Sequence, residues 1–589
     1  MANKGELLTA SAYKDLLKRR IEAAQGIIPC DLVLKHCRIV DVYTQSIREG
    51  DIAVIDGVLA GIGGSYEGRR VVDAGGRYAA PGLIDSHIHI ESSYVSPEEF
   101  GRLVVPPGTT TIIADPHEIA NVCGLAGLKY MAEAAEQTVL DIQFMAPSCV
   151  PATSFDHSGA VIGAEELARA LQDRHILGVG EFMNYPGVTA AQDDVLDKLA
   201  AAHEAGKIVD GHSPGLHGGG LQAYAAAGIR TDHECSTVEE ALERISLGMY
   251  VLLRNGSACR DLPNLIGAVT PQNLRRFLLC SDDLHLKTIF SKGHLNEHLR
   301  LCVRHSISPE GAVTMATLNA AECYGLSDRG ALAPGKRADV VLFDDLQEFS
   351  VWKTFIAGEE VAFEGAYIPP FTRSDSSAVS HTVHLAGFSA DKLRMTLRSP
   401  SVHTIDIIPG SVVTRKGTAT VAVDERGDFV YDAAADIVKV AVVERHHGTG
   451  NVGLGLLRGY GLTKGPVAVS IAHDSHNIIV AGANNGDMAA AVEAVAAQEG
   501  GIAVVLDGAV IASMPLPIAG LMSNRDGHWV EEQAEEIYAA GHEALGIHED
   551  VDVVMTLCFM SLPVIPQIKL LDTGLFDVDA FDFMNIEAD

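Results

Sequence analysis

From Tyr78 onward, the sequence alternates short apolar stretches with alanine-rich stretches of helical character. Such alternation is typical of βα units, in which each strand is followed by a helix that packs on the sheet. Eight apolar stretches can be identified, and they end near His89, Asp115, Pro147, Glu181, His212, His233, Asn255 and Asp282. Eight such units predict a (β/α)8, TIM-like barrel of the α/β class, with its chemistry at the carboxyl ends of the strands.

The segments on either side of this barrel have a different texture. Residues 30–77 and 336–372 contain short runs of alternating apolar and polar residues punctuated by Gly and Asp, which is typical of antiparallel strands. We therefore expect a composite β-sandwich domain whose two parts enclose a barrel domain at residues 78–335.

Both ends of the chain predict further structure. Residues 1–29 form an expected N-terminal helical segment, with an amphipathic helix over 11–25. A Ser-rich stretch at 372–382 reads as a linker. Residues 383–589 are then long enough for a C-terminal domain, and their mixed texture indicates the α+β class.

The composition excludes several classes of partner. The chain has 44 Lys and Arg against 77 Asp and Glu, a formal charge of −33, which repels phosphate backbones and anionic membrane surfaces. We find no long apolar run typical of a membrane span, and the polar N-terminus does not resemble a signal peptide. The 10 cysteines are scattered rather than paired, so we expect reduced thiols in a cytoplasmic protein.

The strongest local signal is His87-Ile-His89 at the end of an apolar run. Residues i and i+2 of a strand point the same way, so both imidazoles can face one ion, although two such histidines can also simply pack. Other candidates stand at four further strand ends, giving four imidazoles and two carboxylates from five strands. The complete predicted ligand set is His87, His89, Glu181, His212, His233 and Asp282.

These candidates offer only nitrogen and oxygen ligands, which suit Zn(II), Fe(II) or Mn(II) without choosing between them. Six ligands exceed the needs of one tetrahedral ion, so we expect a binuclear centre bridged by Glu181. Two metals can generate a hydroxide near neutral pH. Asp282 would then be both a ligand and the acceptor of the hydroxide proton, with Asp283 as its competitor for that role.

Longer motifs extend this interpretation. PGLIDSHIHIE near the start of the barrel and ATLNAAECYGL with GALAPGKRADVVLF after it resemble the amidohydrolase superfamily. TTTIIADPHEIANV, GEFMNYPGV, DGHSPGL, TDHE, CSDD and the tail with VSIAHDSHNIIVAG resemble the adenine deaminases within it. The resemblance covers nearly the whole chain. It implies that adenine is hydrolysed to hypoxanthine and ammonia at two divalent metals, with Mn(II) or Fe(II) favoured over Zn(II), and that the six residues above are the ligands.

Two departures from other superfamily members bear on the chemistry. Hydantoinase-like and dihydroorotase-like members usually bridge their metals with a carboxylated Lys, where this chain has Glu181. Mononuclear adenosine and cytosine deaminases place a Glu shortly after the fifth-strand His to protonate a ring nitrogen. Here His212 is followed by Ser213, Pro214 and Gly215, so another residue must supply that proton.

We predict that Asp282 passes the hydroxide proton to the departing amine and that His117 donates the ring proton, because imidazole titrates near working pH. Asp115 and His117 could instead cap the helix that follows them. Further candidates for contact with the purine base lie just beyond the strand ends, and they are Glu91, Ser92, Asp115 and Asn184.

The tail carries a dense polar motif, His473-Asp-Ser-His476-Asn. It could help close the active site over a small flat substrate, or it could be a solvated loop in a domain that serves oligomerisation. We expect a homo-oligomer, with a dimer favoured. The alternatives to a deaminase are a cyclic-amide hydrolase of the dihydropyrimidinase kind and a non-catalytic scaffold, and the filled ligand positions argue against the scaffold.

Overall fold

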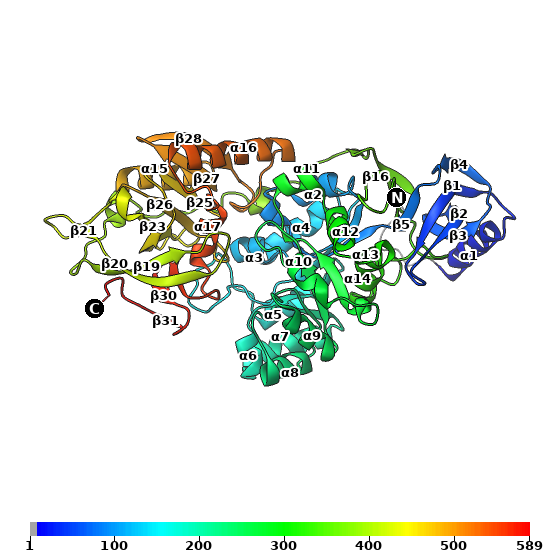
Figure 1. The fold of residues 1–589 in the computed structure, drawn as a ribbon, viewed down its shortest axis with the longest axis horizontal. Helices are drawn as coiled ribbons and strands as arrows, with labels where there is room; N and C mark the ends of the chain where they lie inside the picture. Colours follow the sequence, from blue (N-terminus) through cyan, green and yellow to red (C-terminus); the bar gives the residue numbers. More distant parts are fainter. Residues whose placement is uncertain (1–8, 589) are drawn as a thin grey trace.

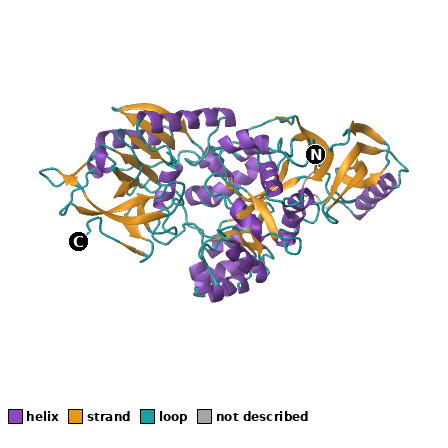
Figure 2. Cartoon of the chain, in the orientation of Figure 1, coloured by secondary structure: helices purple, strands orange, loops and turns teal. Residues whose placement is uncertain are grey.

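The computed structural model describes residues 9–588 and has three parts arranged along its long axis (Figure 1). A small β domain formed largely by N-terminal strands lies at one end, the βα barrel occupies the middle, and the C-terminal domain lies at the other end. Figure 2 shows that strands with a helix beside them form the small domain, and that helices and strands are mixed through the rest of the molecule. Within the described residues, no helix has both the length and the apolar character required to cross a membrane.

The small β domain is built from the segments before and after the barrel. α1 (Ala10–Ala24) lies beside a 9-stranded sheet in the order β18-β17-β16-β15-β5-β1-β2-β3, with β4 paired to β1. Residues 1–8 of the predicted N-terminal segment lie outside the described chain. The strands are β1 (Cys30–Asp41), β2 (Ser46–Ile55), β3 (Val58–Gly64), β4 (Gly68–Asp73), β5 (Tyr78–Pro81), β15 (Val340–Phe343), β16 (Val351–Ile356), β17 (Glu359–Phe363) and β18 (Ala366–Tyr367).

The predicted barrel fold is confirmed. Its parallel strands form one sheet in the order β10-β9-β8-β7-β6-β14 and a second in the order β11-β12-β13, with Asp282 of β14 registered on Ile88 of β6. Every residue of β6 and of β7 is buried, as expected of strands covered on both faces. The strands are β6 (Leu83–His89), β7 (Thr109–Ala114), β8 (Asp141–Ala146), β9 (Ile176–Phe182), β10 (Ile208–Gly211), β11 (Thr231–Asp232), β12 (Tyr250–Arg254), β13 (Phe277–Cys280) and β14 (Asp282–Asp283).

Helices surround the barrel and connect its strands (Figure 2). They are α2 (Pro97–Val104), α3 (His117–Cys123), α4 (Leu125–Ala135), α5 (Ala164–Ala170), α6 (Tyr185–Thr189), α7 (Asp193–Glu204), α8 (Gly218–Ala226), α9 (Val238–Ser246), α10 (Leu262–Leu265), α11 (Leu286–Lys292), α12 (Leu295–Arg304), α13 (Pro309–Met315) and α14 (Leu318–Cys323). A short 3-10 helix, Ile90–Ser93, follows β6 directly. It begins one residue beyond His89 and so lies at the carboxyl end of the first barrel strand.

The C-terminal domain contains an 8-stranded sheet in the order β20-β19-β24-β23-β26-β25-β27-β28. Its strands are β19 (Ser401–Ile407), β20 (Thr414–Thr420), β23 (Ile437–Val443), β24 (Val452–Arg458), β25 (Pro466–Val469), β26 (Ile478–Gly482), β27 (Gly501–Leu506) and β28 (Ala509–Pro515). Smaller sheets contain β21 (Ala422–Val423), β22 (Phe429–Val430), β29 (Ile568–Leu571), β30 (Gly574–Asp577) and β31 (Asp582–Phe583). The helices are α15 (Asn485–Ala497), α16 (Gly527–Ala539) and α17 (Met555–Cys558).

The C-terminal domain packs directly on the barrel. α16 contacts α2 and α11, and the backbone N–H of Gly527 at the start of α16 donates to the buried carboxylate of Glu99 in α2 at 2.8 Å. A single cluster of buried apolar side chains runs from barrel residues such as Phe100 to tail residues such as Leu521. This continuous packing places the tail loops beside the carboxyl ends of the barrel strands.

Candidate metal centre

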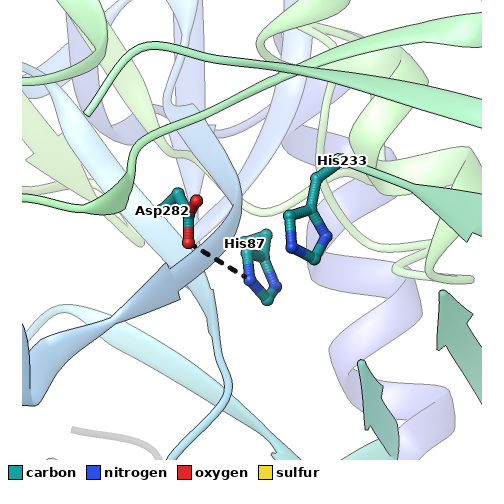
Figure 3. A group of neighbouring side chains, drawn as sticks. All are labelled: His87, His233 and Asp282. Atoms are coloured by element: carbon teal, nitrogen blue, oxygen red, sulfur yellow. Dashed lines mark ion pairs between the residues drawn. The ribbon is translucent and has the colours of Figure 1, made fainter. Parts of the chain in front are cut away.

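Histidine and carboxylate side chains converge at the carboxyl ends of the barrel strands. His87 and His89 are two residues apart on β6, and their Nε2 atoms lie 3.2 Å from one another. The ring of His87 stacks on that of His233 at a centroid distance of 4.1 Å, and its Nε2 lies 3.7 Å from Oδ1 of Asp282. Figure 3 shows these three side chains, with His87 between the other two.

Glu181 lies among the histidines and uses both carboxylate oxygens. Its Oε1 is 3.5 Å from Nε2 of His89, whereas its Oε2 is 2.7 Å from Nδ1 of His212 and 3.2 Å from Nε2 of His233. Burial would raise the pKa of the Glu181 carboxyl, but the adjacent imidazoles outweigh this effect and hold the pKa well below its ordinary value. The geometry of this carboxylate is suited to two neighbouring cations.

The structure thus brings all six predicted ligands together. Their donor atoms form three overlapping groups, each compatible in size with a metal ion: His87, His89 and Glu181; His87, His233 and Asp282; and Glu181, His212 and His233. Five of the six side chains are buried, and His212 is partly exposed. A bound cation would compensate for placing so many polar groups out of water.

Asp115 supports this arrangement from behind. Its backbone carbonyl lies 2.9 Å from Nδ1 of His89, and its side-chain Oδ2 accepts a hydrogen bond from the backbone N–H of Glu181 at 2.8 Å. A Cβ on Gly180 would lie only 2.0 Å from that oxygen, so the contact requires glycine there. α3 has no side-chain cap and begins after Pro116, so the alternative that Asp115 and His117 cap it is wrong.

Two neighbours of the centre were not predicted from the sequence. Arg254, the last residue of β12, donates from Nη1 to Oδ2 of Asp282 at 3.1 Å and also pairs with Glu234. Oε1 of Glu234 lies 3.4 Å from Nε2 of His233 and 3.7 Å from Nδ1 of His212. Glu234 belongs to the TDHE motif, whereas Arg254 stands in no motif that would indicate a place near the metal ligands.

His117 and Glu118 connect the centre to the tail. Nδ1 of His117 is 3.2 Å from Oε1 of Glu181, and Nε2 is 3.4 Å from Oε1 of Glu118. On its other side, Glu118 contacts His473 and His476 of the C-terminal domain. The histidine motif of the tail is therefore buried at the barrel mouth and is not a solvated loop.

A small cavity lies beside this chain of contacts. It measures about 20 Å³, and Glu91, Ser92 and Glu118 line it from the barrel. A larger cavity of about 660 Å³ adjoins it at Tyr94 and His285. Glu118 joins cavity and centre, because its carboxylate also groups with the donor nitrogens of His89 and His117 within 4.8 Å.

The remaining predicted substrate contacts differ in position. Ser92 lines the cavity and donates to Oδ1 of Asp283 at 2.5 Å. Asn184 is half-buried, and its side chain accepts from the backbone N–H of Gly187 at 2.9 Å, which caps α6. Asn184 is not among the residues that line either cavity, and its side-chain oxygen serves the helix cap instead.

Comparison with known proteins agrees with the motifs. Residues 78–361 match the amidohydrolase family, and residues 411–582 match the adenine deaminase C-terminal domain. Adenine deaminase 2 of Desulfotalea psychrophila is 56% identical over 98% of this chain and 100% of its own length. Adenine deaminase of Nitratidesulfovibrio vulgaris is 50% identical over 98% of this chain and 99% of its own length. A solved enamidase aligns with a TM-score of 0.44 and 21% identity over 58% of this chain and 98% of that one.

The barrel, its converging histidines and the matched family model define a hydrolase of the amidohydrolase superfamily, a group characterised by a divalent metal centre. At this identity and coverage, the chain belongs to the adenine deaminase family. The resemblance predicted from the motifs is confirmed.

Proposed function

We propose that this chain hydrolyses adenine to hypoxanthine and ammonia. Water adds its oxygen to C6 of the purine, the bond from C6 to the exocyclic nitrogen breaks, and that nitrogen leaves as ammonia. The observation that carries the proposal is the buried group of four histidines and two carboxylates next to a small cavity, in a chain similar to adenine deaminases over its whole length.

The donor set fits two divalent cations held by His87, His89, Glu181, His212, His233 and Asp282. All donors are nitrogen or oxygen, and the two oxygens of Glu181 face different histidines, as a bridging carboxylate requires. We favour Mn(II) or Fe(II), with Zn(II) as the further candidate. When bound, such ions supply a Lewis acid that activates water near neutral pH.

Asp282 is the proposed proton carrier of the reaction. Its Oδ2 is fixed by Arg254, and its Oδ1 faces His87 and His89 at 3.7 and 3.3 Å. A carboxylate so placed can accept a proton from the attacking water and give it to the departing amine. Arg254 keeps the acceptor oxygen facing the centre throughout.

His117 is the proposed donor to the ring nitrogen. Its two nitrogens face Glu181 and Glu118, which hold the imidazole between the centre and the cavity. Glu91 and Ser92 line the cavity and are the proposed contacts of the base. The variant His117→Gln keeps a hydrogen-bond donor but cannot transfer a proton. It should therefore reduce kcat far more than it changes KM.

The decisive test is ammonia release from adenine, adenosine, guanine and cytosine, with dihydrouracil tested in parallel for ring opening and the metal-depleted protein reloaded with Mn(II), Fe(II) or Zn(II). We expect rapid ammonia release from adenine that depends on added metal. Ring opening of dihydrouracil, followed separately by its ultraviolet absorbance, with no turnover of adenine would replace the proposal by the cyclic-amide hydrolase alternative.

Two further proposals concern the protein in its cell. All 10 cysteines are free, which supports a reducing compartment such as the cytoplasm. A homo-oligomer, with a dimer favoured, remains our expectation, and light scattering after size-exclusion chromatography would measure it.

A further inference from the structure

The loop between β25 and β26 forms part of the wall of the small cavity. Ile471, His473 and His476 line it from the C-terminal domain, facing Glu91 and Glu118 of the barrel. The cavity therefore exists only where the two domains meet. It holds only about 20 Å³, so a purine that reaches Glu118 would lie mainly in the adjoining cavity of about 660 Å³, which both domains also line.

The two tail histidines approach different oxygens of one barrel carboxylate. Nδ1 of His473 lies 3.0 Å from Oε1 of Glu118, and Nε2 of His476 contacts Oε2. All three residues are buried, with His473 the most accessible at 9% exposure. The contact between Nε2 of His476 and Oε2 of Glu118 is not an aligned hydrogen bond, so this carboxylate oxygen can still accept an N–H from a ligand.

The loop is anchored by hydrogen bonds to both domains. The buried guanidinium of Arg445 donates to the backbone carbonyls of His476, Ala519 and Thr382, and it has no carboxylate partner in the ion pairs described. The side chain of Asn477 donates to the carbonyl of His157 at 3.0 Å, which ties the loop to the barrel.

His473 is fixed as well. Its backbone N–H donates to the carbonyl of Cys558 at 2.9 Å, and its ring stacks on Phe559 at a centroid distance of 4.6 Å. These contacts set the direction from which the imidazole meets Glu118.

We propose that His473 and His476 are positioning residues that orient the Glu118 carboxylate so that it accepts an N–H of the purine. This inference rests on the proposed function. A carboxylate that meets an imidazole at each oxygen has less freedom to rotate, which preserves its alignment with a flat ligand and lowers the entropy cost of binding. The C-terminal domain thereby determines how well adenine is bound and turned over, whereas the barrel alone supplies the metal ligands.

The two histidines present different nitrogens, which gives a sharp test. The amide nitrogen of Asn can replace Nδ1, and that of Gln can replace Nε2. His473→Asn and His476→Gln are therefore matched substitutions. His473→Gln and His476→Asn are mismatched ones, and His473→Ala and His476→Ala remove the contact. His447→Ala is the control, because His447 also contacts the barrel, at the carbonyl of Ser158, but not Glu118.

We expect kcat/KM for adenine to fall on the order of 10- to 100-fold in the alanine and mismatched variants, as for a lost charged hydrogen bond. The matched variants should recover most of the activity, and metal content should equal that of the wild type in all of them. In a Glu118→Gln background, either alanine substitution should add little further loss, because both act through the same carboxylate.

Equal losses in matched and mismatched variants, or fully additive losses in the Glu118→Gln background, would overturn the positioning role. Loss of a bound ion from both alanine variants would overturn it too, since the three residues would then form a metal site. Failure of the wild type itself to release ammonia from adenine would instead refute the proposed function, which keeps the two failures apart.

Discussion

Arg254 and Asp282 are joined by a hydrogen bond of 3.1 Å from Nη1 to Oδ2, which leaves Oδ1 of Asp282 facing Nε2 of His89 at 3.3 Å. Asp282 adopts a left-handed backbone conformation, with φ of 59°, at the point where β14 pairs with β6. The side chain is therefore directed by both a guanidinium and an unusual backbone angle. Such strain is tolerated where the surrounding structure fixes it.

This geometry distinguishes Asp282 from its neighbour. Asp282→Asn should lower kcat on the order of a thousandfold with a smaller change in KM, because the amide cannot accept the proton. Asp283→Asn should cost less than about tenfold, because the side chain still accepts from Ser92. Steady-state kinetics on both variants would reassign the proton carrier if their order were reversed.

Removing an imidazole should remove metal. His89→Ala deletes a ring whose Nε2 lies within 3.5 Å of His87, Glu181 and Asp282, so we expect loss of about one ion per chain and of nearly all turnover. Inductively coupled plasma mass spectrometry would measure the ions. His203→Ala on the exposed face of α7 serves as control and should retain wild-type metal content. Full metal loading and activity in His89→Ala would contradict the ligand assignment.

The bridging role of Glu181 predicts a specific defect. Glu181→Gln keeps the size of the side chain but removes the negative charge between two cations, which would then repel one another. We expect fewer than two ions per chain and a large fall in kcat. Titration of the metal-free variant with Mn(II) would count the ions that it binds. Two tightly bound ions would mean that another group bridges them.

A buried lysine in the tail predicts a pH dependence of stability. Burial lowers the pKa of Lys569 from 10.5 to about 7, and its Nζ donates to the carbonyls of Val412 and Phe559. Between these pH values only the unfolded chain is protonated, so stability rises with pH over this window. The destabilisation is fully present below pH 7 and is lost toward pH 10.5. Across this window the free energy of unfolding should rise by on the order of 5 kcal/mol.

Lys569→Met should abolish this slope. The melting temperature of the wild type should increase relative to that of the variant as the pH rises from 7 toward 10. Lys464→Met, at an exposed position, should follow the wild type throughout. Parallel curves for wild type and Lys569→Met would show that the amine is charged in the folded protein.

The sequence predicted the barrel well because apolar strand runs and polar strand ends repeat along it. The same repetition located the six metal-ligand candidates, since residues at the carboxyl ends of barrel strands face one another. Arg254 could not be predicted because a single arginine at the end of a strand has no characteristic spacing. The contact of Glu118 with His473 could not be predicted either, because it depends on how two separately folded regions pack.

The 9-stranded sheet at the N-terminal end also constrains how the chain is made. β5 pairs with β15 in register from Tyr78 on Phe343 to Pro81 on Val340, so the first strands to leave the ribosome gain this neighbour only after the whole barrel has been synthesised. Until then, the edge of β5 exposes unpaired backbone groups, a feature that invites aggregation. The chain must therefore keep β5 from pairing wrongly while the roughly 260 residues up to Phe343 are synthesised, and fusions or truncations that end before Val340 should depend on chaperones or precipitate.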